Sequence, residues 1–285
     1  MSRVAVVTDS AADLDPGRAA ALGIIVVPLI VSFGSDSYRA GVEMTTEAFW
    51  ARMTAADAPF PKTAAASPGV FKEVFELAFE AGADAIVCVT VGAALSGTNK
   101  SATIAAEALA EREIHVVDSR NASMGQGILA ILATELAAEG VPPEEIARTL
   151  DARADDVETV VVLDTLEYLR KGGRISGPQA AIGTLLSVKP IIAIKDGLVD
   201  TLDRVRTRSK ARARAVQHLT AHPIERMAVL HTVSPDVESF RDELLARVSG
   251  GLDPGRVSVE LVGPSVGPHL GPGAVGASVL RRRAG

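Results

Sequence analysis

Residues 84–98 read DAIVCVTVGAALSGT, and this stretch decides the fold class. An aspartate is followed by a run of apolar and β-branched residues, then by a turn of small residues and a Ser-Gly-Thr sequence that can start a helix. Uninterrupted apolar runs of this length are typical of strands buried on both faces, as in parallel sheets covered by helices. The stretch therefore predicts a strand-turn-helix unit of an α/β fold.

The same alternation continues through the rest of the first half. Asp15-Pro16 and Ser67-Pro68 each place a side-chain acceptor before a proline whose missing N–H costs nothing at a helix start. β-branched runs and Ala-rich stretches predict strands at 4–8, 24–29, 84–91 and 114–118, and helices near 16–22, 68–81, 98–112 and 124–139. The first half is expected to form a parallel sheet with helical cover.

The pattern changes after the polar stretch 151–158. Asp196-Gly197, a dipeptide preferred in two-residue hairpins, separates two apolar runs and predicts antiparallel pairing. Further elements are predicted as helices at 143–153, 207–221 and 236–248, and as strands at 159–163, 191–195, 198–200, 227–231 and 257–262. We expect a parallel-sheet α/β domain over residues 1–155 and a smaller α/β domain with a mixed sheet over 156–285. The glycine-rich C-terminal segment and Arg281-Arg282-Arg283 are interpreted as a loop and a frayed end.

The composition excludes several classes of protein. Of 285 residues, 47% are hydrophobic but only 4% aromatic, so the core must be largely aliphatic. A net charge of −6 argues against a nucleic-acid partner or general affinity for anionic membranes. The single Cys88 cannot form an intrachain disulfide. No apolar run approaches the roughly 18 residues that span a bilayer, and none suits a signal peptide, so we expect a cytoplasmic location.

Candidate binding residues follow the predicted strands. Ser96-Gly97-Thr98 opens a helix whose unpaired N–H groups attract anions, at the strand end where open α/β sheets bind ligands. An ordinary helix cap is the alternative. Thr63 can face the same crevice or belong to a surface loop. Asp9-Ser10 follows the first strand, where the aspartate is either a phosphoryl acceptor or, because no second aspartate follows at position 11, a cap.

His269 lies within the glycine- and proline-rich run GPHLGPGAVG, residues 267–276. Glycines let a backbone approach a ligand closely, and a neutral imidazole can bridge a hydroxyl and a carboxylate. A structural histidine bonded to loop carbonyls is the alternative. No residues show metal-ligand spacing, so neither a metal nor a cofactor is expected. Between Arg170 and Arg214, eleven Lys or Arg outnumber three Asp, which suits an acidic partner, a phosphate or a solvated helix face.

In their order and spacing, these motifs resemble the bacterial DegV family, which includes the fatty-acid-binding subunit of fatty acid kinase. The resemblance runs almost end to end. It rests on Thr8-Asp9-Ser10, Thr63 with Ser67-Pro68, Ser96-Gly97-Thr98, Asp118-Ser119 with Gly125-Gln126-Gly127, residues 166–175, Lys189-Pro190-Ile191, Val205-Arg206-Thr207 and residues 268–276. One departure is the Thr-Ala-Ala-Ala-Ser sequence at 63–67, where the family has a more polar stretch; it is expected to alter the pocket mouth.

The resemblance implies that a long-chain fatty acid such as palmitate lies between the two domains. It implies that the chain is a carrier, not an enzyme, that presents the acid to a separate ATP-dependent kinase subunit for acyl-phosphate formation and phospholipid precursor supply, with transient membrane contact. The implied residues are Thr63, Ser96, Gly97, Thr98 and His269 at the carboxylate, Asp9, Ser10, Ser123 and Gly271 around the pocket, and Arg174 and Arg206 at the partner or a phosphate. Burying about fourteen methylenes would contribute roughly 11 kcal/mol before ordering costs.

A serine hydrolase with Ser96 as nucleophile and His269 as base is the alternative. Against it, Ser96 lacks a Gly-x-Ser-x-Gly elbow and no carboxylate is an obvious third member of a triad. Phosphotransfer by the chain alone would call for a Gly-x-x-x-x-Gly-Lys-[Ser/Thr] loop, which the sequence lacks.

Overall fold

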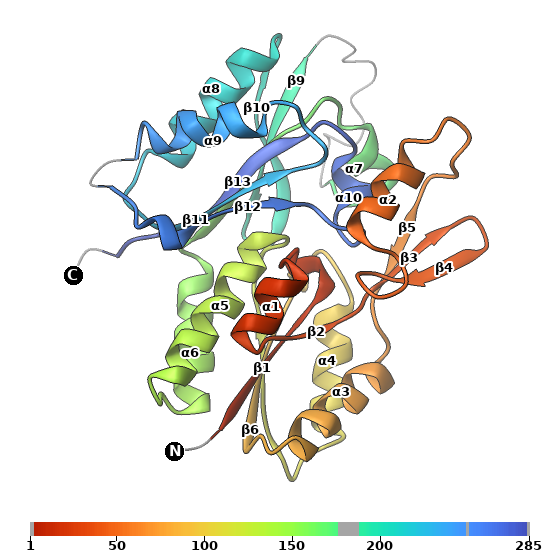
Figure 1. Cartoon of the computed structure of the whole chain (residues 1–285), viewed down its shortest axis with the longest axis vertical. Coiled ribbons are helices and arrows are strands. Elements are labelled where there is room, and N and C mark those ends of the chain that lie inside the picture. Colours follow the sequence, from red (N-terminus) through yellow and green to blue (C-terminus); the bar gives the residue numbers. More distant parts are fainter. Residues whose placement is uncertain (1–2, 176–187, 249–250, 284–285) are drawn as a thin grey trace.

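The computed structural model describes residues 3–175, 188–248 and 251–283, and Figure 1 shows their arrangement. The first sheet is parallel, with strand order β2-β1-β6-β7. Every residue of β6 is buried, as the apolar run predicts. The strands of this sheet are β1 (Val4–Asp9), β2 (Ile25–Val27), β6 (Ala85–Thr90) and β7 (Glu113–Asp118).

Helices cover both faces of the first sheet (Figure 1). Successive side chains of a strand point to opposite faces. Val7 is accordingly buried with Phe71 and Phe75 on one side, whereas Val6 is buried with Ile128 on the other. The helices are α3 (Pro68–Glu80) and α4 (Thr98–Glu107) on one face, α5 (Met124–Ala138) and α6 (Pro143–Ala154) on the other, and α1 (Pro16–Leu22) beside β2.

The second sheet is mixed, with strand order β10-β9-β8-β13-β11-β12. Neighbouring strands are antiparallel except β11 and β12, which are parallel. Helices α8 (Arg208–Leu219) and α9 (Val237–Leu245) pack on one face. The strands are β8 (Val157–Val162), β9 (Lys189–Lys195), β10 (Leu198–Val205), β11 (Ile224–His231), β12 (Val257–Leu261), preceded by the short η3 (Pro254–Arg256), and β13 (Val275–Arg281).

Helix α5 is shared by the two sheets. It contacts β1 and β6 of the first sheet and β8, β11 and β13 of the second (Figure 1). Its residues from Met124 to Ile131 are all buried. A Cβ added at Gly127 would lie 2.9 Å from the carbonyl oxygen of Ala12, so this helix packs directly against neighbouring backbone. The two sheets therefore meet across one buried helix.

A small antiparallel sheet, β4-β3-β5, projects beside α2 (Thr46–Met53) (Figure 1). The sequence predicts one strand over 24–29, but β2 ends at Val27 because Pro28 has no N–H to donate to a ladder. The chain then enters β3 (Ile30–Phe33) and β4 (Asp36–Arg39), and returns in β5 (Lys62–Ala64). Pairing of Val31 with Thr63 fixes the position of Thr63.

The C-terminal segment departs most from the sequence prediction. The predicted loop contains the start of β13, which lies between β8 and β11 inside the second sheet. The frayed end is also wrong at Arg281, which forms an ion pair with Glu158 and donates to the carbonyl of Leu219. Among the described residues, the helices that the sequence did not predict are α2, α7 (Glu167–Lys171), α10 (Gly267–Leu270) and the 3-10 turns η1 (Ser10–Ala12) and η3.

The α/β class, with one parallel and one mixed sheet, is confirmed. The domain boundary at residue 155 stays a prediction. Across the described ranges, no helix has both the length and the apolar composition that a membrane crossing requires.

Candidate functional site

A largely apolar pocket of about 840 Å³, part of it open to solvent, lies between the two sheets. One wall is the face of the second sheet opposite α8. Directly paired residues share a face of a sheet, and the register pairs Thr159 with Ile194, Ile194 with Val199, and Val161 with Ile192. The pocket residues on this face are Thr159, Val161, Ile192, Ile194, Val199 and Leu230.

The remaining walls come from segments far apart in sequence. Ala11 and Val91 follow β1 and β6, at the carboxyl ends of the parallel strands where the sequence predicts a ligand. Ala64 is exposed and also lines the pocket, so the alanine run 64–66 does reach the mouth. The other apolar lining residues are Leu29, Ala65, Leu95, Ala122, Leu169, Val266 and Leu270. None of the described lining residues is an aspartate or glutamate.

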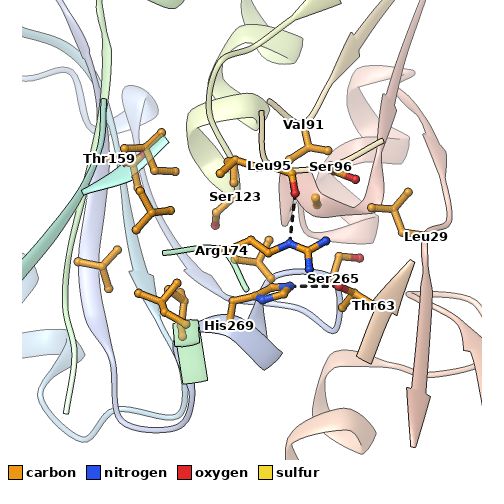
Figure 2. Close-up of a pocket in the computed structure, with 18 of the residues that line it drawn as sticks. Leu29, Thr63, Val91, Leu95, Ser96, Ser123, Thr159, Arg174, Ser265 and His269 are labelled. Atoms are coloured by element: carbon orange, nitrogen blue, oxygen red, sulfur yellow. Dashed lines mark hydrogen bonds between the residues drawn. The ribbon is translucent and has the colours of Figure 1, made fainter. Parts of the chain in front are cut away.

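Thr63 and His269 meet at the pocket wall (Figure 2). Thr63 Oγ1 lies 3.1 Å from Nε2 of His269, which α10 carries. Burial, with a smaller effect from the positive charge of Arg174, lowers the pKa of His269 to about 4. The imidazole is therefore neutral at pH 7 and offers one donor and one acceptor.

Two glycines allow α7 and α10 to approach closely. A Cβ added at Gly172 would lie 2.1 Å from Nδ1 of His269, so the imidazole lies against the Gly172 backbone. Gly271 has φ of 73°, and its Cβ would lie 2.2 Å from Cδ2 of Tyr168. On its other side, Tyr168 stacks on Phe60 with 6.2 Å between ring centroids. These contacts hold His269 in one orientation.

Arg174 lies in the pocket wall beside His269 (Figure 2). Its Nε donates to the carbonyl of Leu95 at 3.3 Å, and Nη1 donates to the carbonyl of Gly172 at 2.6 Å. The resemblance associates this arginine with a partner or a phosphate, and no sequence pattern indicated that it lines the pocket. Among the described residues that line the pocket, Arg174 is the one whose side chain carries a permanent charge.

The three residues of the Ser96-Gly97-Thr98 motif lie in different environments. Ser96 lines the pocket, and its Oγ lies 2.8 Å from Oγ1 of Thr98. The backbone N–H of Thr98 donates to Ser96 Oγ at 3.3 Å, so this serine also satisfies part of the start of α4. Gly97 is exposed and Thr98 is fully buried, and neither is among the lining residues. Both sequence interpretations of Ser96, ligand contact and helix cap, are therefore compatible with its position.

Asp9 and Ser10 lie behind the pocket wall. The Asp9 carboxylate accepts N–H bonds from Ala11 and Val91, at 2.9 and 2.8 Å, and burial raises its pKa to about 6. Asp9 therefore caps the turn that follows β1, which is one of the two roles considered for it from the sequence. Ser10 Oγ accepts from the Leu29 N–H and lies 2.8 Å from Oγ of Ser265. Ser265 lines the pocket and was not predicted from the sequence.

Ser123 lines the pocket, and its hydroxyl donates to the carboxyl of Asp13. Like Ser265, Asp13 was not predicted from the sequence. Asp13 also accepts from the Gly263 N–H at 2.8 Å. Burial raises the pKa of Asp13 to about 7. The carboxyl thus joins the turn after β1 and the start of α5 to the segment that leads into α10.

The geometry does not support the hydrolase alternative. Ser96 and His269 line the same pocket, but Ser96 Oγ pairs with Thr98, and His269 Nε2 pairs with Thr63. Within the described residues, Nδ1 of His269 has no hydrogen-bond partner, so no carboxylate orients the imidazole as in a triad. A pKa of about 4 also makes this histidine a weak base.

Arg206 is exposed between β10 and α8, away from the pocket lining. Other cations of the basic run are already paired: Arg208 and Arg212 with Asp236, and Lys189 with Asp164. Among the described residues, no group of three His, Cys, Asp or Glu is placed to hold a metal ion.

Comparisons with known proteins match nearly the whole chain. A family model described as "Uncharacterised protein, DegV family" matches residues 3–282. A DegV domain-containing protein of Caldanaerobacter subterraneus subsp. tengcongensis is 34% identical, over 97% of this chain and 98% of that protein. A DegV family protein of Thermus thermophilus, described for its fatty acid binding, is 34% identical with a TM-score of 0.88, covering 98% of this chain and 100% of that one. A stearic-acid-binding protein of Eubacterium ventriosum is 29% identical with a TM-score of 0.86, covering 99% and 98%.

Proposed function

The chain belongs to the DegV family, and from this membership and the pocket we propose that it binds a long-chain fatty acid and presents it to a kinase subunit. The observation that carries the proposal is the distribution of polarity in one pocket. Thr63, Ser96 and Ser265 lie on one side of the pocket in Figure 2. The opposite wall is the face of the second sheet, which is aliphatic except for Thr159, whose hydroxyl is already hydrogen-bonded to Asn121 and Ser278. A ligand with one polar end and one long apolar end matches this distribution.

The carboxylate would lie against Thr63, Ser96, His269 and Arg174. Hydroxyl and imidazole donors and a guanidinium are the groups that stabilise a carboxylate, and charge-assisted hydrogen bonds are the stronger ones. No acidic side chain among the described lining residues would repel it. In this proposal Arg174 contributes to binding, in addition to the role toward a partner or phosphate that the resemblance implies.

The acyl chain would lie on the aliphatic face of the second sheet. Each buried methylene contributes about 0.8 kcal/mol, so a chain such as that of palmitate gains most of its affinity here. The polar groups then mainly fix which end of the ligand lies near the surface. Relatives of similar fold are described as binding fatty acids, including stearic acid, which supports a ligand of this class.

Presentation to a kinase would use the polar end. Gly97 is exposed, and Ser96 and Arg174 are partly exposed, so a carboxylate bound there lies close to the surface. A kinase would transfer the γ-phosphoryl group of ATP to a carboxylate oxygen, releasing ADP and forming an acyl phosphate. Arg206, which is exposed, is the second residue that we propose to contact the kinase.

Mass spectrometry of lipid released by denaturing the protein purified from a bacterial host tests the binding step. We expect a long-chain fatty acid at near-stoichiometric amount. Absence of released lipid, together with failure of the delipidated protein to bind palmitate or oleate, would refute the proposal.

The kinase step needs a separate assay. Loaded protein, an ATP-dependent fatty acid kinase subunit from the same host and ATP should yield an acyl phosphate, which hydroxylamine traps as a hydroxamate. ATP hydrolysis by this chain alone would contradict the division of labour.

A further inference from the structure

The pocket and a second cavity meet at Ile194. This second cavity, here called the charged cleft, has an empty volume of about 980 Å³ that includes open solvent. Ile194 lines both the pocket and the charged cleft, and the residue is partly exposed. The ionisable residues that line the cleft are Arg120, Asp155, Asp156, Glu158, Lys195, Asp196, His218 and Arg281.

The wall between the two cavities has a polar half and an apolar half. In the polar half, Thr159 donates to Asn121 Oδ1 at 2.7 Å and lies 2.7 Å from Ser278 Oγ. Asn121, which lines the cleft, donates from Nδ2 to the carbonyl of Val157 at 3.2 Å. The apolar half is Ile194, which both cavities share and whose side chain lies between those of Thr159 and Val199 on one face of the sheet.

The two halves differ in how firmly they are held. The polar groups are buried and mutually hydrogen-bonded, so displacing one of them would leave another without a partner. Ile194 is held by packing alone and can be replaced without breaking a hydrogen bond. Thr159 lies across the pocket from Thr63 in Figure 2, so this wall is at the far end from the proposed carboxylate site.

We propose that Ile194 sets the longest acyl chain that the pocket accepts. This inference rests on the proposed fatty acid binding. Methylenes that fit between the carboxylate site and Ile194 are transferred from water to an apolar wall, and each adds to affinity. A longer chain has to displace Ile194 and enter a cleft lined by charged groups and open to solvent, where further methylenes gain little.

The test is a series of saturated fatty acids of increasing length, titrated into delipidated protein by calorimetry. Affinity of the wild type should rise with length and then fall beyond the longest chain that fits. Ile194→Ala removes three carbon atoms from the wall, so this limit should move up by about two carbons. For an acid two carbons above the wild-type limit, we expect about a tenfold gain in affinity. Ile194→Phe should lower the limit.

Two control variants separate this role from general packing. Ile192 lines the pocket but not the cleft. Ile192→Ala is the same isoleucine-to-alanine change, and it should weaken the binding of fatty acids of every length without moving the length limit. Leu202→Ala removes an aliphatic side chain that lines the cleft but not the pocket, and should leave the dependence of affinity on chain length unchanged. Because the two Ile194 variants are expected to shift the limit in opposite directions, a folding defect in one leaves the other informative.

An unchanged limit in both Ile194 variants overturns the inference, as does a shift in Ile192→Ala or Leu202→Ala of equal size. If the wild type binds no fatty acid of any length, the proposed function itself fails, which is a different result.

Discussion

Replacement of Gly172 by alanine tests the carboxylate site through a single added carbon. Gly172 has φ of −76° and ψ of −10°, values that alanine adopts freely, so the backbone is not strained. The new Cβ would lie 2.1 Å from Nδ1 of His269, whereas non-bonded heavy atoms in contact prefer about 3.5 Å. The imidazole must therefore move by more than about 1 Å, and its 3.1 Å contact with Thr63 would be broken or strongly distorted.

The expected loss of palmitate affinity can be estimated from the hydrogen bond between Thr63 and His269. A hydrogen bond of this kind contributes about 0.5–1.5 kcal/mol net, which corresponds to roughly a two- to twelvefold weaker binding of palmitate. Forcing a carbon into a packed contact typically costs a further 1–3 kcal/mol of stability. Calorimetric titration of delipidated protein measures the first effect, and urea unfolding measures the second.

Gly97→Ala is the matched control. Gly97 has φ of −71°, and no atom lies within 4 Å of its ideal Cβ position. The same Gly-to-Ala change there keeps the backbone N–H and should leave both binding and stability close to those of the wild type. If Gly172→Ala also binds palmitate with unchanged affinity, then the position of His269 does not matter for the ligand, and the proposed carboxylate site is wrong.

Three further substitutions address single groups. Thr63→Val keeps the shape but removes the hydroxyl, so palmitate affinity should fall about two- to twelvefold; unchanged affinity would remove Thr63 from the site. Calorimetric unfolding should show a loss of about 1–3 kcal/mol, because Nε2 of His269 loses its hydrogen-bond partner. Arg174→Gln removes the positive charge that is the smaller of the two causes lowering the pKa of His269. NMR titration should therefore find this pKa raised but still below 6.5, because the imidazole remains buried. A pKa that does not move would show that Arg174 is not close to His269. Asp13→Asn should flatten the pH dependence of stability. The folded state of the wild type holds a proton up to about pH 7 that the unfolded chain releases near 3.8, so its stability falls as pH rises between these values, by up to about 4 kcal/mol. Urea unfolding at pH 5 and pH 8 measures the part of this decline that falls above pH 5, roughly 3 kcal/mol, and an equal decline in the variant would assign it to other groups such as Asp9.

The elements that were predicted correctly have strong local signals. The β6 run is long and apolar, and Ser67-Pro68 fixes the start of α3. The elements that were missed are stabilised by contacts distant in sequence. β13 contains glycine and follows a glycine- and proline-rich run, yet it forms an interior strand because β8 and β11 supply partners on both sides. The apolar residues at every second position, Val275, Ala277 and Val279, were the available signal, and in the structure every residue from Val275 to Leu280 is buried.

The residues of the candidate site were also only partly predictable from the sequence. Positions after predicted strands and in the glycine-rich run made Thr63, Ser96 and His269 candidates, and the family resemblance grouped them in one site; the structure places all three in one pocket. Ser265 and Asp13 were missed because nothing near them in sequence suggests their partners, which lie more than a hundred residues away. The position of Arg174 in the pocket wall likewise depends on the carbonyl of Leu95, which no local pattern indicates.

The positions of the site residues depend on the contact between α7 and α10. Helices of five and four residues are too short to be stable alone, so α7 and α10 depend on their neighbours. Tyr168 packs on Gly271 and stacks on Phe60, three residues before Thr63, while Gly172 supports the ring of His269. The contacts that hold α7 in place therefore also position both partners of the Thr63–His269 hydrogen bond. A carboxylate bound between these partners would link β5 to α10, so ligand binding and the order of this contact stabilise each other, and substitutions within it act on one coupled structure.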